Sequence, residues 1–171
     1  LISERLNANG SKQFRELLLK EDWDGILEMA RTEVEEGAHV LDICTAYVGR
    51  DEAGDQSQIL KRAASQLQAP LMIDSTQVDV LRTGLELLGG RSIINSINLE
   101  DGRVKLDRIC SLARRHGAVL IALCIDEHGM AKTTARKLEI AKRIFQICCA
   151  EHGLAADALI FDPLTFTIAS G

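Results

Sequence analysis

The chain has 171 residues, of which 46% are hydrophobic and 26% charged, a composition typical of an ordinary folded domain. Its 20 basic and 25 acidic residues give a net charge of −5, and only 4% of residues are aromatic, so we expect no nucleic-acid partner. No apolar run is long enough to cross a membrane, the first residues do not resemble a signal peptide, and five cysteines without a CxxC pair favour a reducing, cytoplasmic location.

Short apolar segments alternate with amphipathic segments along the chain. Each apolar segment has the length and the β-branched content of a buried strand. Each amphipathic segment places its apolar residues at helical spacing, and Asp22 stands where the N-terminal cap of one helix belongs. The expected strands are 1–6, 39–43, 70–74, 92–95, 119–125 and 158–162, and the expected helices are 22–36, 55–67, 78–88, 103–116 and 134–151.

This alternation predicts a parallel sheet, which occurs in doubly wound folds and in (β/α)8 barrels. The glycine-rich dinucleotide fingerprint and the phosphate-binding loop of the doubly wound folds are both missing. Polar residues instead stand near the ends of many different strands, and a site assembled in this way is typical of the barrel. We therefore predict an α/β fold, a (β/α)8 TIM barrel. The polar residues are Asp42, Asp74, Asn95, Asp126 and Asp162.

The predicted barrel is short of strands. About six βα units are visible in this chain, whereas a complete barrel has eight strands and about 250 residues. We expect residues 1–171 to form one barrel domain that is incomplete on its C-terminal side and part of a larger protein. Open edges on the first and last strands would favour self-association, and Phe166 and Ile168 are expected to pack against polypeptide from outside this sequence.

Three of the polar residues, Asp74, Asn95 and Asp162, form the candidate ligand site. Ionised carboxylates only accept hydrogen bonds, whereas an amide both donates and accepts. The complementary ligand is a flat heterocycle with N–H and NH₂ donors on one edge, such as a pterin or a guanine-like ring. Two other interpretations stay open. Each aspartate could cap a helix or form a turn, as Asp162 before Pro163 would. The carboxylates could also hold a magnesium-like cation, but no dense acidic cluster supports this and we expect no metal.

Five segments resemble the motifs of the pterin-binding barrels. They are ERLNANGS (4–11), LMIDST (71–76), IINSIN (93–98), CIDEHGMAKT (124–133) and FDPLTF (161–166). They are similar above all to the methyltetrahydrofolate-binding domain of cobalamin-dependent methionine synthase and related corrinoid methyltransferases. In that family the aspartate of IDS, the asparagine of NS and the aspartate of DP hold the pterin, and they match Asp74, Asn95 and Asp162. The residues expected to support these three are Glu4, Asn7, Asp42, Ser96 and Asp126.

The resemblance implies a methyltransferase with 5-methyltetrahydrofolate as substrate. The methyl group would pass to cob(I)alamin carried by a corrinoid-binding domain or protein. The family group closest to the methylated nitrogen is an asparagine on strand seven, which is not among the predicted strands, so no catalytic residue is assigned and the isolated segment is expected to be inactive. One alternative is a dihydropteroate synthase, although residues 42–50 lack that enzyme's Gly-Glu-Ser-Thr-Arg-Pro type of anion loop. The other alternative is a non-catalytic pterin-binding fragment.

Overall fold

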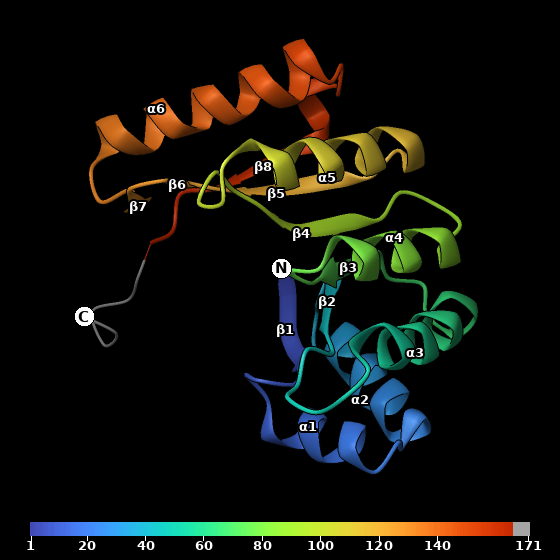
Figure 1. Cartoon of the computed structure of the whole chain (residues 1–171). Coiled ribbons are helices and arrows are strands. Elements are labelled where there is room, and N and C mark those ends of the chain that lie inside the picture. The colour runs from blue at the N-terminus through green and yellow to red at the C-terminus, as the bar shows by residue number, and fades with distance from the viewer. Residues whose placement is uncertain (166–171) are drawn as a thin grey trace. The chain divides into compact units, whose positions relative to one another are not determined.

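The computed structural model describes residues 1–165, which fall into two compact units (Figure 1). The first unit runs from Leu1 to Asn95, and the second begins at Ser96. Each unit is built from strands that alternate with helices, which confirms the predicted α/β class. Phe166 and Ile168, for which the sequence predicts a packing partner, lie outside the described residues.

The first unit contains four parallel strands in the order β1-β2-β3-β4, with a β-bulge in β1 between Ser3 and Leu6. Strand β4 continues across the boundary between the units. The elements are β1 (Ile2–Asn7), α1 (Lys12–Leu19), α2 (Trp23–Glu35), β2 (Val40–Cys44), α3 (Glu52–Gln66), β3 (Leu71–Asp74), α4 (Val78–Leu87) and β4 (Ile93–Ile97).

Helix α1 was not among the predicted elements. Its eight residues span barely two turns, too short for a clear periodic signal. The Ser11 hydroxyl accepts a hydrogen bond from the Phe14 N–H and so caps the helix, while Phe14 and Leu18 are fully buried. The predicted cap of α2 is confirmed, because the Asp22 carboxylate accepts from the Gly25 N–H at 2.9 Å.

The second unit pairs β5 and β8 in parallel and adds a small antiparallel hairpin of β6 and β7. The predicted strand 119–125 therefore ends two residues early and turns into the hairpin, where Gly129 has a φ of 92°. The predicted helix 134–151 is α-helical only as far as Phe145. The elements are α5 (Arg103–His116), β5 (Val119–Leu123), β6 (Ile125–Asp126), β7 (Gly129–Met130), α6 (Thr134–Phe145), a π-helical segment (Gln146–Glu151), a 3₁₀ turn (Ala156–Ala158) and β8 (Leu159–Asp162).

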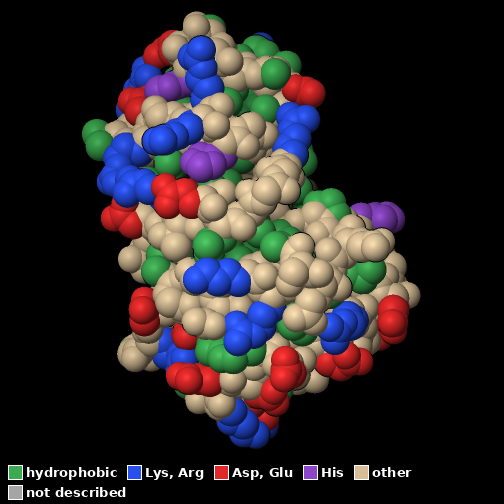
Figure 2. Space-filling view, turned by 90° about the vertical axis from the view of Figure 1, so that its right-hand side faces the viewer, with side chains coloured by type: hydrophobic (Ala, Val, Ile, Leu, Met, Phe, Trp, Pro, Cys, Tyr) green, Lys and Arg blue, Asp and Glu red, His purple; other side chains and the backbone are tan. Residues whose placement is uncertain are grey.

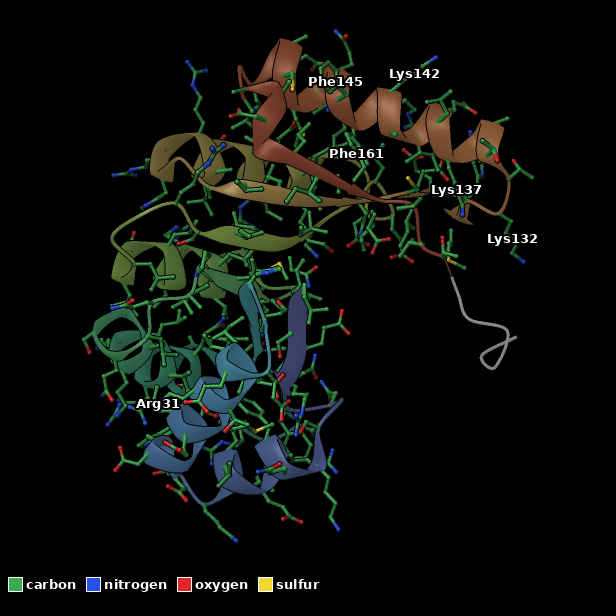
Figure 3. The ribbon with its side chains drawn as sticks, turned by 180° about the vertical axis from the view of Figure 1, so that it is seen from behind. Arg31, Lys132, Lys137, Lys142, Phe145 and Phe161 are labelled. Carbon is green, nitrogen blue, oxygen red and sulfur yellow. The ribbon has the colours of Figure 1, made fainter. Side chains whose placement is uncertain are left out.

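Helix α6 has one buried side and one exposed side of mixed character, which includes Leu138, Glu139 and Phe145. Ile140 and Ile144 are fully buried, whereas Lys142 is exposed. Figure 3 shows Lys142 and Lys137 on this helix and Lys132 in the segment that leads into it. On the face drawn in Figure 2, acidic and basic side chains are interspersed among apolar and neutral ones. Within residues 1–165, none of the helices combines the length and the apolar character that a bilayer crossing requires.

The helices of the first unit cover the face of the sheet that carries Ile73. Gly84 of α4 approaches Ile73 of β3 closely, so this side chain points toward the helices. Because side chains alternate along a strand, Met72 and Asp74 lie on the opposite face. The register pairs Asp74 with Asn95 and Asp42 with Met72, which places these polar side chains away from α3 and α4.

Replacing Gly84 by alanine is expected to destabilise the fold. A Cβ atom at this position would lie 2.8 Å from Ile73 Cδ1 and 3.1 Å from Leu60 Cδ1, so buried side chains must shift. Overpacking of this kind costs about 1–3 kcal/mol, partly offset by alanine's higher helix propensity of about 1 kcal/mol. The control is Gly89→Ala, where no atom lies within 4 Å of the added Cβ. Urea unfolding followed by circular dichroism measures both, and equal midpoints for the two variants would show that the close approach at Gly84 is unimportant.

Candidate functional site

Strands β2, β3 and β4 bring three predicted residues together in the first unit: Asp74 is the last residue of β3, whereas Asp42 and Asn95 are the third of five residues in β2 and β4. Asp74 and Asn95 stand directly opposite each other in the β3–β4 register. The Asn95 Nδ2 atom donates a hydrogen bond to Asp42 Oδ2 at 3.3 Å. Two carboxyl groups and one amide from three neighbouring parallel strands thus form one polar cluster, the strand-end cluster of Asp42, Asp74 and Asn95.

Asp42 is the most buried member of this cluster, with 2% of its surface exposed. Its Oδ1 atom has no hydrogen-bond partner among the described residues. The pKa of Asp42 is raised to about 7, mainly by burial and further by the charges of Asp74 and Glu4, while the Asn95 hydrogen bond acts in the opposite direction. Asp42 is therefore a buried carboxyl group that changes charge near neutral pH.

Asp74 is half-buried, and a ligand can reach it more easily. Burial raises its pKa, and nearby Glu52 and Glu4 add to this effect, whereas a hydrogen bond from the Cys44 thiol lowers it. Burial and the charge of Asp74 raise the pKa of Cys44 to about 12, so the thiol stays protonated as a neutral donor. Sequence analysis missed Cys44, although it lies two residues after Asp42 and so on the same face of β2.

A second polar group, also unpredicted, supports the loop after β3. The buried Glu52 accepts hydrogen bonds from Ser75 Oγ at 2.5 Å and from Gln77 Nε2 at 2.6 Å. The Ser75 N–H donates to the backbone carbonyl oxygen of Asn95 at 3.2 Å. Gln77 is the N-cap of α4 and has no side-chain cap, so Asp74 does not have the helix-capping role considered above. These contacts leave the Asp74 carboxylate available for a ligand.

An open hollow lies beside the Glu52 contacts, between the β2–α3 and β3–α4 loops. Its volume is about 550 Å³, and Tyr47, Glu52, Thr76 and Gln77 are among the residues that line it. The hollow belongs entirely to the first unit. Asp74 does not line this hollow, but the charge of Glu52, which does, raises the pKa of Asp74.

Asn7 and Glu4, both on β1, were predicted to support the site. The Asn7 Oδ1 atom accepts hydrogen bonds from the N–H groups of Asn9 and Gly10, each at 2.9 Å, so this side chain closes the turn after β1. Glu4 is exposed and acts on Asp42 and Asp74 through its charge. The structure thus shows Asn7 in a local turn and an electrostatic effect of Glu4, and the supporting role of both toward a ligand stays a prediction.

Asp162, Ser96 and Asp126 belong to the second unit, and the structure describes them within it. Asp162 is exposed at the end of β8, opposite Leu123 in the register. Its Oδ1 atom accepts the Leu164 N–H at 2.7 Å, which confirms the turn predicted from Asp162-Pro163 and leaves the other carboxylate oxygen outside this turn. Ser96 is half-buried.

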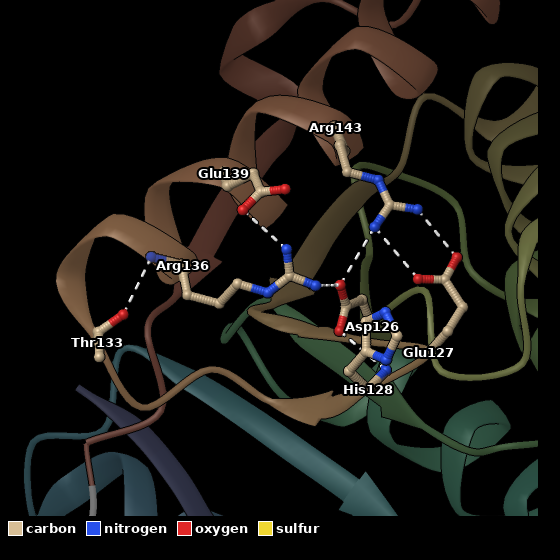
Figure 4. A network of polar contacts seen from close by, with 7 residues as sticks. All are labelled: Asp126, Glu127, His128, Thr133, Arg136, Glu139 and Arg143. Atoms are coloured by element: carbon tan, nitrogen blue, oxygen red, sulfur yellow. Dashed lines mark hydrogen bonds and ion pairs between the residues drawn. The ribbon is translucent and has the colours of Figure 1, made fainter.

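Asp126 is fully buried and lies at the centre of a charged network that joins the hairpin to α6 (Figure 4). Arg136 and Arg143 both form ion pairs with its Oδ2 atom, and its Oδ1 atom accepts the His128 N–H at 3.1 Å. Arg143 also binds Glu127 at 2.9 Å and lowers the pKa of that carboxyl to about 2. Both oxygens of Asp126 therefore hold the hairpin in place, and any support of the ligand site would be indirect.

The described part of the chain contains no cluster of side chains suited to bind a metal ion. Among residues 1–165, no group of three or more histidine, cysteine, aspartate or glutamate side chains is placed to hold a metal ion. The strand-end cluster offers two carboxyl groups and one amide, a set that suits the N–H donors of a heterocycle.

The buried carboxyl of Asp42 predicts a pH-dependent stability. Because its pKa is raised to about 7 from 3.8, the folded protein binds more protons than the unfolded chain between these values. The stabilisation is therefore present below pH 3.8 and is lost as the pH rises through about 7. Asp42→Asn removes this titration, so we expect its unfolding free energy to gain about 1–4 kcal/mol relative to wild type between acidic and mildly alkaline pH. Urea unfolding across this range gives the difference, and parallel pH profiles would contradict the raised pKa.

Comparisons with known proteins identify the family to which this chain belongs. The sequence model of a family described as "Pterin binding enzyme" matches residues 3–171. The chain is 44% identical to the methionine synthases of Mycobacterium tuberculosis and Mycobacterium leprae, over 100% of its own length. It spans only 15% and 14% of these two relatives.

Solved structures show the same fold at low sequence identity. A dihydropteroate synthase from Yersinia pestis in complex with a sulfonamide drug matches 92% of this chain and 57% of its own, with a TM-score of 0.67 and 17% identity. The dihydropteroate synthase of Vibrio fischeri matches 82% of this chain and 56% of its own, with a TM-score of 0.62 and 15% identity. The fold neighbours are thus pterin-related barrels, and the expectation of a partial barrel is consistent with them. The chain belongs to the pterin-binding enzyme family, and methionine synthases are among its relatives.

Proposed function

We propose that this chain binds the pterin ring of 5-methyltetrahydrofolate and presents its methyl group to cob(I)alamin carried by another domain or protein. The observation that carries the proposal is the strand-end cluster, where Asp74 and Asn95 meet in register beside the buried Asp42. It occurs in a chain that is 44% identical to two methionine synthases. The proposed pterin-binding residues are Asp74, Asn95 and Asp162.

The chemistry of a pterin edge suits these side chains. The ring presents N–H and NH₂ donors together with acceptor atoms, and carboxylate and amide groups complement this pattern. Each charge-assisted hydrogen bond contributes about 1.5–3 kcal/mol. A donor placed against Asp74 also stabilises its charged form, which burial otherwise disfavours. Binding of the ring and ionisation of the Asp74 carboxyl group therefore favour each other.

Methyl transfer places a further demand on the site. When the N5–CH₃ bond breaks, its electron pair stays on N5, so this nitrogen must gain a proton or a strong hydrogen bond as the methyl group leaves. The corrinoid would supply the methyl acceptor. The residues of this chain bind and orient the ring, and none of them is assigned as the proton donor to N5.

The substitution Asp74→Asn or Asp162→Asn is expected to weaken binding of 5-methyltetrahydrofolate about tenfold or more, because one charge-assisted hydrogen bond is lost. The substitution is nearly isosteric, so circular dichroism should show an intact fold. The matched control is Asp24→Asn, an exposed position in the first turn of α2, which should bind as wild type does. Isothermal titration calorimetry measures all three. Unchanged affinity in both site variants would exclude these residues as pterin ligands.

Chelation of metals is expected to leave this binding unchanged. The carboxyl groups are proposed to accept hydrogen bonds from the ring, so no divalent cation is needed between them and the ligand. A titration in the presence of EDTA tests this directly. If EDTA removes the affinity and magnesium restores it, the cation-binding alternative is right and the hydrogen-bonding account is wrong.

Adding pyrophosphate to the titration distinguishes methyl transfer from the dihydropteroate synthase reaction. A site of the dihydropteroate synthase type also binds the pyrophosphate leaving group, so pyrophosphate should then change the affinity for a pterin. A methyl-transfer site has no such requirement, and we expect no effect. A pyrophosphate-dependent affinity would move the assignment to the synthase reaction.

A further inference from the structure

Asp42 combines burial with an incomplete set of hydrogen bonds. Only 2% of its surface is exposed, and its Oδ1 atom has no partner among the described residues. Its other oxygen accepts one hydrogen bond, from Asn95 Nδ2. A buried carboxyl group with an unpaired oxygen is unfavourable for the fold, and an apolar side chain would pack there at lower cost. We therefore look for the role of this carboxyl group in its hydrogen bond with Asn95.

The direction of this hydrogen bond determines how the Asn95 amide is turned. The Asn95 Nδ2 atom faces Asp42 Oδ2, which accepts its hydrogen whether the carboxyl group is ionised or carries a proton on Oδ1, so the amide directs its NH₂ group toward Asp42. The side-chain carbonyl oxygen of Asn95, Oδ1, then lies on the other side of the amide group, away from Asp42. Asn95 is half-buried, whereas Asp42 is sealed, so a ligand can reach the amide but not the carboxyl group behind it.

We propose that Asp42 is a positioning residue for the pterin, which acts by holding the Asn95 amide with its carbonyl oxygen turned toward a ring N–H donor. Asp42 itself does not touch the ligand. The charged groups that face Asp42 are Asp74 on β3 and Glu4 on β1, and both are acceptors, so neither can replace Asn95 as its donor. This inference rests on the proposed function, because it assumes that Asn95 contacts the ring.

A double-mutant cycle between positions 42 and 95 tests the inference, with affinity for 5-methyltetrahydrofolate as the readout. Asp42→Asn keeps an oxygen that can accept from Asn95, so we expect its affinity to stay within about threefold of wild type. Asp42→Leu has no acceptor, and we expect binding about tenfold weaker. In the Asn95→Ala background the same Asp42→Leu change should have almost no effect, because the amide that Asp42 holds is gone.

The controls separate positioning from a general effect on the fold. Thermal unfolding of each variant reports whether it is folded, and Asp42→Ala serves as the second acceptor-free variant if Asp42→Leu does not fold. Asp24→Asn, on α2, should match wild type in binding.

Several outcomes would overturn the inference. An equal loss from Asp42→Leu with and without Asn95 would show an effect on the fold rather than on the amide. A loss in Asp42→Asn as large as that in Asp42→Leu would show that the carboxylate itself is required. If wild type binds 5-methyltetrahydrofolate normally and every Asp42 variant does too, only the positioning role fails. If wild type itself shows no affinity for a pterin, the proposed function fails and this inference with it.

Discussion

Burial of carboxyl groups at the ends of parallel strands is the constraint on which the first unit depends. A parallel sheet covered by helices offers few places for charge, and the carboxyl ends of the strands are where polar side chains emerge. Asp42 and Asp74 emerge there on neighbouring strands, and each raises the cost of charging the other. Asn95 and the neutral Cys44 thiol are the donors that offset this cost. The site is therefore an electrostatically unsatisfied region, and a ligand with several N–H donors would relieve it.

The surrounding structure keeps these groups in place. Glu52, at the start of α3, accepts hydrogen bonds from Ser75 and Gln77 and so connects α3 to the loop after β3. The Ser75 N–H in turn donates to the backbone carbonyl oxygen of Asn95. On the other side of the sheet, Gly84 lets α4 approach Ile73 closely. In the second unit, Asp126 performs a comparable task for the hairpin by binding Arg136 and Arg143. Buried acidic groups thus have two roles in this chain, since both oxygens of Glu52 and of Asp126 have hydrogen-bond partners, whereas Asp42 Oδ1 has none among the described residues.

Much of this arrangement was predictable, because hydrophobic periodicity and strand ends are local features. The periodicity located the six parallel strands and five of the helices to within a few residues, and the polar residues at strand ends pointed to Asp42, Asp74 and Asn95. Helix α1 was too short to be detected, and the hairpin after β5 depends on Gly129 and on a turn made by Asp126. The roles of Cys44 and Glu52 could not be predicted, because they depend on contacts between side chains far apart in the sequence. Only the structure shows that one oxygen of Asp42 has no partner within residues 1–165 and that Asp126 is bound by two arginines.

The central claim is that Asp74 and Asn95 of the strand-end cluster accept hydrogen bonds from a pterin ring. Isothermal titration calorimetry with 5-methyltetrahydrofolate over a series of pH values, in buffers of different ionisation enthalpy, tests it most directly because it reports both affinity and proton exchange. Burial raises the pKa of Asp74 in the free protein, and a bound N–H donor lowers it again, so the account predicts saturable one-to-one binding with net release of protons. The absence of saturable binding, or binding with net proton uptake, would contradict it.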